Sequence, residues 1–170
     1  MENTDISRRK FVKGLAGGVA GIAAFGSTQG MSALSYSSII GANEKLNIGV
    51  IGCGGMAFSH MEALLAMKQS DNVRITAVCD IYTKRLEQAK KLTGAQAFKN
   101  YKELLQNKDI DYVLIATPEH WHYQMTLDAI SAGKHIYVEK PMTHTIEQAK
   151  DIVEKVEASK LKLQVGVQGM

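Results

Sequence analysis

The chain carries a glycine-rich segment of the kind that binds the phosphates of a dinucleotide. An apolar run, Leu46–Ile51, leads directly into Gly52–Ala57, whose sequence G-C-G-G-M-A matches the pattern G-x-G-x-x-A. In this pattern the first glycine allows a tight turn, the second lets backbone amides approach a pyrophosphate, and the small last residue lets the next helix pack closely on the strand. The amide-rich start of that helix faces the phosphates. The predicted phosphate-binding residues are therefore Gly52, Gly54, Gly55, Met56 and Ala57.

A carboxylate follows the next apolar run. Val73–Cys79 is predicted to be a strand, and Asp80 comes directly after it. A carboxylate at this point accepts hydrogen bonds from both adenosine ribose hydroxyls and repels a 2′-phosphate, so Asp80 favours NAD over NADP. Its separation from Gly54 is longer than the roughly 20 residues usual for the motif, which a longer helix or loop explains. The alternative role for Asp80 is to cap a helix that begins near Tyr82.

Apolar runs and helical periodicity alternate along the rest of the chain. Strands are predicted at Leu46–Ile51, Val73–Cys79, Tyr112–Ala116, His135–Val138 and Leu161–Val165, with a weaker extended segment at Gln96–Phe98. Helices are predicted at Met56–Met67, Tyr82–Leu92, Tyr101–Gln106, His122–Ala132 and Thr145–Ser159. This alternation predicts an α/β fold, a doubly wound parallel sheet of the Rossmann type, with helices on both faces. The domain is predicted to span residues 44–168.

The unusual residue clusters all follow predicted strands. Gly52–Ala57, Asp80, Thr117–His122 and Glu139–Pro141 each come after the carboxyl end of a different strand. Right-handed crossovers bring those ends to one edge of the sheet, which is where open α/β sheets bind ligands. We therefore expect the four clusters to form one site.

Two of these clusters resemble motifs of the Gfo/Idh/MocA family, named for glucose–fructose oxidoreductase and inositol dehydrogenase. They are Ala116–His122, which reads A-T-P-E-H-W-H, and Glu139-Lys140-Pro141, and the resemblance runs from about Lys45 to Val167. It implies an N-terminal Rossmann domain that holds NAD or NADP. It also implies a C-terminal α/β domain that covers the nicotinamide and shapes a sugar or polyol site.

By the same resemblance, individual residues receive roles. Thr117, Pro118 and His122 would lie along the nicotinamide half of the cofactor, and Glu139 near the nicotinamide ribose. Lys140 would contact both the nicotinamide and the substrate hydroxyl. A cation suits that position, because hydride removal from a carbinol carbon requires a group that holds the oxygen and relays its proton.

The remaining histidines and the single tryptophan have several possible roles. His120 and His122 flank Trp121, but no third ligand is placed by the sequence, so no metal site is predicted. Trp121 and His120 either line the entrance, where the tryptophan stacks on a sugar ring, or Trp121 packs half-buried beneath a second domain. Cys53 and Cys79 are expected to pack as small apolar residues, with a redox bridge as the alternative.

The first residues resemble a twin-arginine export signal. Ser7–Lys13 reads S-R-R-K-F-V-K and precedes the mildly apolar, glycine-rich Gly14–Gly26, whose 13 residues are too few for a membrane-spanning helix. Residues 1–43 are therefore predicted to be a signal peptide and linker, and the protein is expected to be exported to the periplasm. From position 14 onward the chain holds 16 basic and 15 acidic residues, a net charge of +1. This balance gives no support for a nucleic-acid surface.

The sequence ends at Met170, where the family would enter its second domain. We therefore expect an N-terminal fragment of an exported NAD-dependent oxidoreductase that acts on a sugar or polyol, inactive alone and homo-oligomeric when full length. One alternative is a relative that oxidises a sugar transiently in order to cleave or isomerise a glycoside. Another is a nucleotide-binding module without catalysis of its own.

Overall fold

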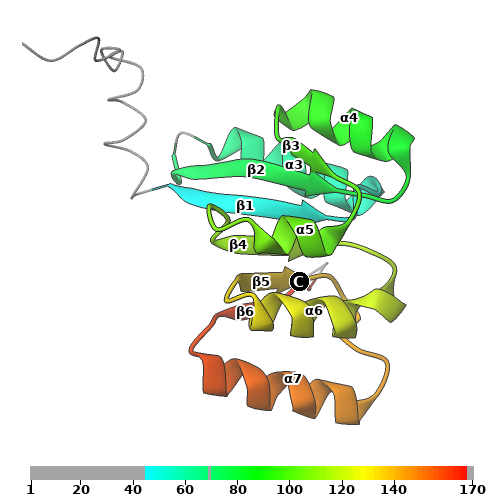
Figure 1. The fold of residues 1–170 in the computed structure, drawn as a ribbon, viewed down its shortest axis with the longest axis vertical. Coiled ribbons are helices and arrows are strands. Elements are labelled where there is room, and N and C mark those ends of the chain that lie inside the picture. Colours follow the sequence, from blue (N-terminus) through cyan, green and yellow to red (C-terminus); the bar gives the residue numbers. More distant parts are fainter. Residues whose placement is uncertain (1–44, 69, 168–170) are drawn as a thin grey trace, which may run out of the picture. The chain divides into compact units, whose positions relative to one another are not determined.

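The described strands form one parallel sheet. The computed structural model describes residues 45–68 and 70–167, so the predicted export signal lies outside the described residues. The sheet has six strands in the order β3-β2-β1-β4-β5-β6 (Figure 1), and every neighbouring pair is parallel. Their bounds are β1 Leu46–Ile51, β2 Val73–Cys79, β3 Gln96–Phe98, β4 Tyr112–Ile115, β5 His135–Val138 and β6 Leu163–Val165. This is the strand order of the doubly wound dinucleotide-binding fold, which confirms the predicted fold class.

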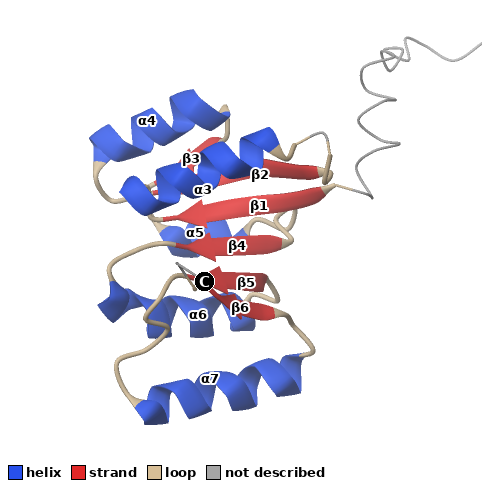
Figure 2. Ribbon diagram, turned by 180° about the vertical axis from the view of Figure 1, so that it is seen from behind, coloured by secondary structure: helices blue, strands red, loops and turns tan. Residues whose placement is uncertain are grey.

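Helices cover both faces of the sheet. Helices α3 (Gly55–Ala66) and α4 (Thr83–Thr93) lie on the face turned forward in Figure 2. Helices α5 (Tyr101–Gln106) and α6 (His122–Ser131) lie on the opposite face, and α7 (Ile146–Ser159) packs beside α6. The short 3₁₀ helix η1 (Glu119–Trp121) leads into α6. Each face has its own apolar cluster, and the β1 residues Val50 and Ile51 belong to different clusters because alternate side chains point to opposite faces.

Most predicted element bounds are matched within a residue, and the last strand differs most. It begins at Leu163 rather than at the predicted Leu161. Lys160 ends α7 in the left-handed region at φ 60°, and Leu161 donates its backbone N–H to Ser159 Oγ at 3.3 Å. Lys160 and Leu161 are thus used in the turn that precedes β6.

Local side-chain bonds fix the ends of the helices that lead to the site. Thr145, the N-cap of α7, accepts a hydrogen bond from the backbone N–H of Gln148 at 3.2 Å. The Gln148 side chain in turn accepts from the backbone N–H of His144, the residue before the N-cap, at 3.1 Å. His144 is thereby a helix-start residue.

Among the described residues, no helix has the length and apolar character needed to cross a membrane.

A buried lysine holds the loop that precedes β4. The Lys134 ammonium donates to the carbonyl oxygens of Asn107 at 2.8 Å and Ile110 at 2.7 Å. Burial lowers its pKa from the ordinary value, and nearby Asp111 and Asp109 oppose that shift. Lys134 therefore serves the fold at the edge of the sheet away from the clusters described above.

Candidate nucleotide-binding site

A cavity of about 840 Å³ lies at the carboxyl ends of β1, β2 and β4. Its size falls in the range of small-molecule and cofactor sites. The walls are formed by Ile51, Gly52, Gly54, Gly55, Met56, Cys79, Asp80, Ile81, Tyr82, Arg85, Lys99, Asn100, Tyr101, Ala116, Thr117, Pro118, His120, Trp121 and Met125. Strands β1 and β4 are neighbours from which the chain winds in opposite directions, and this switch point is where doubly wound sheets bind their ligands.

The glycines of the turn after β1 serve different purposes. Gly52 adopts φ +89°, and a Cβ there would lie 2.6 Å from the carbonyl oxygen of Ala116, so the fold itself requires glycine. At Gly54 a Cβ would meet nothing nearer than Arg85 Nη1 at 3.9 Å, and at Gly55 it would meet no described atom within 4 Å. Nothing in the described part of the chain demands glycine at these two positions. The open space above them fits the close approach of a pyrophosphate.

Helix α3 directs its positive end toward this space. Its N-cap is Gly54, which has no side chain to cap the helix, and its first turn contains no acidic residue. The helix dipole and the backbone amides there favour an anion. Ala57 is fully buried in the cluster that holds Ile48 and Val50, as expected for the residue that allows close packing of helix on strand.

Asp80 lies on the cavity wall beside the glycine turn and binds two backbone amides. Its Oδ2 accepts the N–H of Cys53 at 2.8 Å, and its Oδ1 accepts the N–H of Tyr82 at 2.7 Å. The second bond stabilises the turn that leads into α4, whose N-cap is Tyr82, so Asp80 is not the N-cap of that helix. A carboxylate has about four lone-pair sites, so both oxygens can still accept hydrogen bonds from ribose hydroxyls.

Two basic side chains lie near Asp80. Arg85 lines the cavity, and its guanidinium carbon sits 5.9 Å from the centre of the Tyr82 ring. Lys99 also lines the cavity and donates to Thr83 Oγ1 at 2.6 Å. Both positive charges complement a pyrophosphate and offset the negative charge of Asp80.

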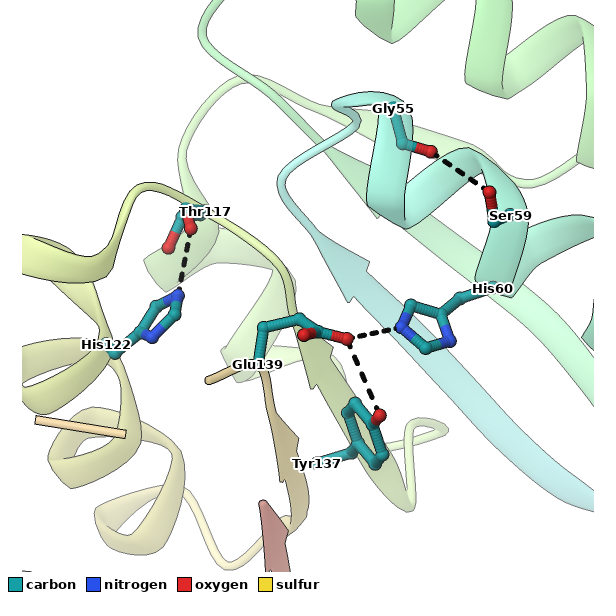
Figure 3. A network of polar contacts seen from close by, with 7 residues as sticks. All are labelled: Gly55, Ser59, His60, Thr117, His122, Tyr137 and Glu139. Atoms are coloured by element: carbon teal, nitrogen blue, oxygen red, sulfur yellow. Dashed lines mark hydrogen bonds and ion pairs between the residues drawn. The ribbon is translucent and has the colours of Figure 1, made fainter. Parts of the chain in front are cut away.

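The loop after β4 is fixed by His122, the first residue of α6. The residue is 1% exposed. Nε2 lies 2.9 Å from the carbonyl oxygen of Thr117 and Nδ1 lies 2.8 Å from that of Pro141 (Figure 3 shows the first contact). The ring is absent from the cavity wall and both nitrogens face carbonyl oxygens. His122 thus joins the Thr117 loop to the Glu139–Pro141 loop, and its expected place along the nicotinamide half of the cofactor stays a prediction.

Glu139 contacts a residue that the sequence did not single out. Its carboxylate, at the end of β5, lies 2.5 Å from Nε2 of His60 on α3 and 3.5 Å from the hydroxyl of Tyr137 (Figure 3). Glu139 is 5% exposed and does not line the cavity. Its backbone N–H donates to Ile115 at 3.0 Å, which places it beside the start of the Thr117 loop.

Lys140 is exposed and follows Glu139 at the same edge of the sheet. The Lys140–Pro141 peptide bond is cis. Lys140 is not among the residues that form the cavity wall, whereas Thr117 and Pro118 are. The structure therefore brings Lys140 to the edge that holds the cavity and leaves its side chain outside it.

Trp121 and His120 both line the cavity. Trp121 is 45% exposed, and its ring centre lies 6.0 Å from that of His120. Both side chains are thus placed to contact a ligand in the cavity, and the two roles expected for Trp121 stay predictions. Among the described residues, no group of three or more histidine, cysteine or acidic side chains could hold a metal ion.

Cys53 and Cys79 are free and buried, and the Cys53 thiol lies 3.6 Å from the carbonyl oxygen of Cys79. Burial, reinforced by the charge of Asp80, raises the pKa of each thiol to about 12. Both are therefore protonated and unreactive near neutral pH, which favours the packing role over the redox bridge.

Comparison with known families bears directly on this geometry. The family model for Gfo/Idh/MocA, described as an oxidoreductase family with an NAD-binding Rossmann fold, matches residues 46–167. The chain belongs to the Gfo/Idh/MocA oxidoreductase family. Its fold and its glycine turn are those of an NAD-binding domain.

Relatives of this Gfo/Idh/MocA chain include glycosyl hydrolase family 109 proteins. One from Shewanella sp. (strain ANA-3) is 36% identical over 126 residues, which cover 67% of this chain and 26% of the relative. Another, from Shewanella baltica (strain OS185), is 29% identical over 174 residues, covering 90% of this chain and 37% of the relative. The chain therefore spans about a quarter to two fifths of the length of these relatives.

Solved structures show the same fold. The WlbA dehydrogenase from Bordetella pertussis, solved with NADH and UDP-GlcNAcA, is 28% identical with a TM-score of 0.67, over 72% of this chain and 37% of that one. The apo scyllo-inositol dehydrogenase from Lactobacillus casei is 29% identical with a TM-score of 0.67, over 72% and 36%.

Of the cofactor contacts predicted from the sequence, residues of the glycine turn, Asp80 and the Thr117 loop line the cavity of this Gfo/Idh/MocA domain. It missed Arg85 and Lys99 on the cavity wall and His60 behind Glu139. Arg85 sits in the first turn of the helix that follows Asp80, so helical placement alone could have indicated it. His60 lies 79 positions from Glu139, and no local pattern joins them.

Proposed function

We propose that this chain is the NAD-binding domain of an enzyme that removes hydride from a carbinol carbon of a sugar or polyol. The observation that carries the proposal is the cavity itself, with space above Gly54 and Gly55, Asp80 on its wall and Lys140 at the same sheet edge. The sugar-acting dehydrogenases among the similar structures support the substrate class.

Within this proposal each end of the site has its own task. The α3 amino terminus holds the pyrophosphate, and Asp80 accepts the ribose hydroxyls. Bound NAD supplies the hydride acceptor. Lys140, in its amine form, takes the proton of the substrate hydroxyl. The ammonium that results then stabilises the oxygen of the carbinol group.

A second candidate function is cleavage of a glycoside through transient oxidation of its sugar. The family 109 glycosyl hydrolases among the relatives favour it. In such a reaction the hydride returns to the sugar after cleavage, so the cofactor is unchanged over a full cycle. The same Lys140 chemistry serves both candidates, since each begins by removing hydride from a carbinol carbon.

Turnover assays on the protein as its cells produce it separate these functions. Sugars, polyols and aryl glycosides are supplied with NAD, and NADH and released aglycone are both measured. NADH formed in proportion to substrate supports the dehydrogenase, and aglycone released without NADH accumulation supports the glycosidase. NAD binding with neither product on any substrate would reduce the protein to a nucleotide-binding module.

We also propose that the protein is exported by the twin-arginine pathway and retains its NAD, because this pathway carries folded proteins and NAD is scarce outside the cytoplasm. The proposal rests on Ser7–Lys13 and on the apolar segment after it. Cell fractionation of the wild type and of a variant with Arg8 and Arg9 changed to lysine tests export. Periplasmic protein purified without nucleotide would overturn the retention part. We further propose a homo-oligomer for the full-length protein, which light scattering would test.

A further inference from the structure

His60 contacts Glu139 across the interior of the domain. His60 belongs to α3, and Glu139 follows β5, with Nε2 and Oε1 2.5 Å apart. The side chains are 25% and 7% exposed, respectively. The His60 ring also meets Tyr137 edge-on, with ring centres 5.3 Å apart and planes at 68°. Figure 3 shows both rings directed at one carboxylate oxygen.

A carboxylate buried to this degree requires hydrogen-bond donors. Removing such a charge from water is costly unless donors are fixed around it. His60 provides a nitrogen donor and Tyr137 a hydroxyl donor to the same oxygen. The His60 contact, at 2.5 Å, is much shorter than the Tyr137 contact, at 3.5 Å, so it is the stronger of the two.

Close packing on the other side limits where Glu139 can move. A Cβ at Gly166, just after β6, would lie 2.5 Å from the Tyr137 hydroxyl oxygen and 3.1 Å from Glu139 Cδ. The backbone at Gly166 thus presses against both side chains. His60 on one side and Gly166 on the other define the orientation of the carboxylate.

The His60 contact joins two parts of the site that are far apart in the chain. Helix α3 starts at the glycine turn, and His60 lies on its second turn. Glu139 directly precedes Lys140 and hydrogen-bonds through its backbone to Ile115, next to the Thr117 loop. A bond from His60 to Glu139 therefore fixes the nicotinamide side of the edge relative to the phosphate-binding helix.

We propose that His60 is a positioning residue for the nicotinamide-riboside half of the cofactor, acting through Glu139. This inference rests on the proposed function, because it assumes that the dinucleotide extends from Asp80 toward Glu139. It assigns His60 no contact with the adenosine or pyrophosphate half. Removal of the donor therefore affects ligands that carry the nicotinamide riboside and spares those that lack it.

Calorimetric titration of the chain with NADH and with ADP tests this assignment. ADP occupies only the adenosine and phosphate half, so it reports on the glycine turn and Asp80 alone. His60→Leu is expected to weaken the binding of NADH about tenfold and to change the affinity for ADP by less than about twofold. His60→Gln, whose amide nitrogen reaches the same position as Nε2, should restore most of the NADH affinity. Glu62→Gln, an exposed change on the same helix, is the control and should alter neither ligand.

Other results would overturn the assignment. Equal losses for NADH and ADP in His60→Leu would mean that His60 only supports α3, and an unchanged NADH affinity would mean that it does nothing for the cofactor. If His60→Leu does not fold, His60→Asn, one methylene too short, replaces it and must bind NADH more weakly than His60→Gln. If the wild-type chain binds ADP, and binds NADH no more tightly than ADP, this inference alone is overturned. Wild-type chain that binds neither ligand would overturn the proposed function.

Discussion

Asp80 accepts the backbone N–H of Cys53 at 2.8 Å, and this one bond joins the end of β2 to the glycine turn after β1. The other carboxylate oxygen accepts from Tyr82 at the start of the next helix. The side chain expected to select the cofactor thus also holds the shape of the turn. Cofactor selection and local stability are coupled at this residue.

Replacement of Asp80 by alanine should therefore have two effects. Loss of two hydrogen bonds to a charged acceptor should lower the free energy of unfolding by about 2 kcal/mol, measured by urea denaturation. Loss of the carboxylate should weaken the binding of NADH and reduce the preference of the protein for NADH over NADPH, both measured by titration. An unchanged NADH to NADPH ratio would contradict the ribose assignment whatever happens to stability.

Gly52 and Gly54 form a matched pair for separating folding from binding. Gly52→Ala should cost at least about 2 kcal/mol of unfolding free energy, because φ is +89° and the Ala116 carbonyl blocks a Cβ. Gly54→Ala should leave the unfolding free energy nearly unchanged. It should weaken the binding of NADH at least about tenfold, because the added methyl group fills the space for the pyrophosphate. Thermal melts and NADH titration distinguish the two. Similar stability losses for both variants would show that the fold requires both glycines.

His122 is expected to act on the two loops that it joins. His122→Phe removes contacts with the Thr117 and Pro141 carbonyls and should lower the unfolding free energy by about 2 to 4 kcal/mol. Hydrogen exchange should accelerate in residues 116–122 and 139–145. His120→Ala, at an exposed neighbour, serves as the control and should change stability by less than about 0.5 kcal/mol. Unaltered exchange in both loops would refute the joining role.

Lys140 should matter for chemistry and little for folding. Lys140→Met is expected to reduce turnover about 10²- to 10⁴-fold, because the group that handles the hydroxyl proton is lost. The melting temperature should stay the same, since the side chain is exposed. Rapid-mixing measurement of NADH formation tests the effect in the protein as its cells produce it, with Lys140→Arg as the variant that keeps the charge. Full activity of Lys140→Met would exclude a role in proton transfer.

The buried thiols predict a loss of stability at alkaline pH. The folded-state pKa of Cys53 and Cys79 is raised to about 12, above the value of about 8.5 for an unfolded thiol. Their contribution is therefore complete below about pH 8.5 and is lost as the pH rises toward 12. Urea denaturation at about pH 8 and about pH 10.5 should show a larger decrease for the wild type than for a Cys53→Ala, Cys79→Ala variant, in which the tyrosines still titrate. Equal decreases would assign the effect to the tyrosines.

Local patterns predicted much of this fold and the glycine half of the site. The strand before Gly52 and the strand before Asp80 are short apolar runs with clear ends, so their bounds and their common edge follow from the sequence. The direction of His122 could not be predicted, because helical periodicity gives the start of α6 but not which loops its ring meets. The His60–Glu139 contact joins α3 to the residue that follows β5, and its formation is decided by packing across the whole sheet.

Lys134 and Lys140 stand six positions apart with opposite access to solvent. The Lys134 amine is enclosed by two carbonyl oxygens, whereas Lys140 is exposed. An acylating reagent would therefore mark Lys140 and spare Lys134 in the folded chain, and mass spectrometry would read the difference within a single peptide. Protection of Lys140 when NADH is added would then report, residue by residue, how far the dinucleotide reaches along the sheet edge.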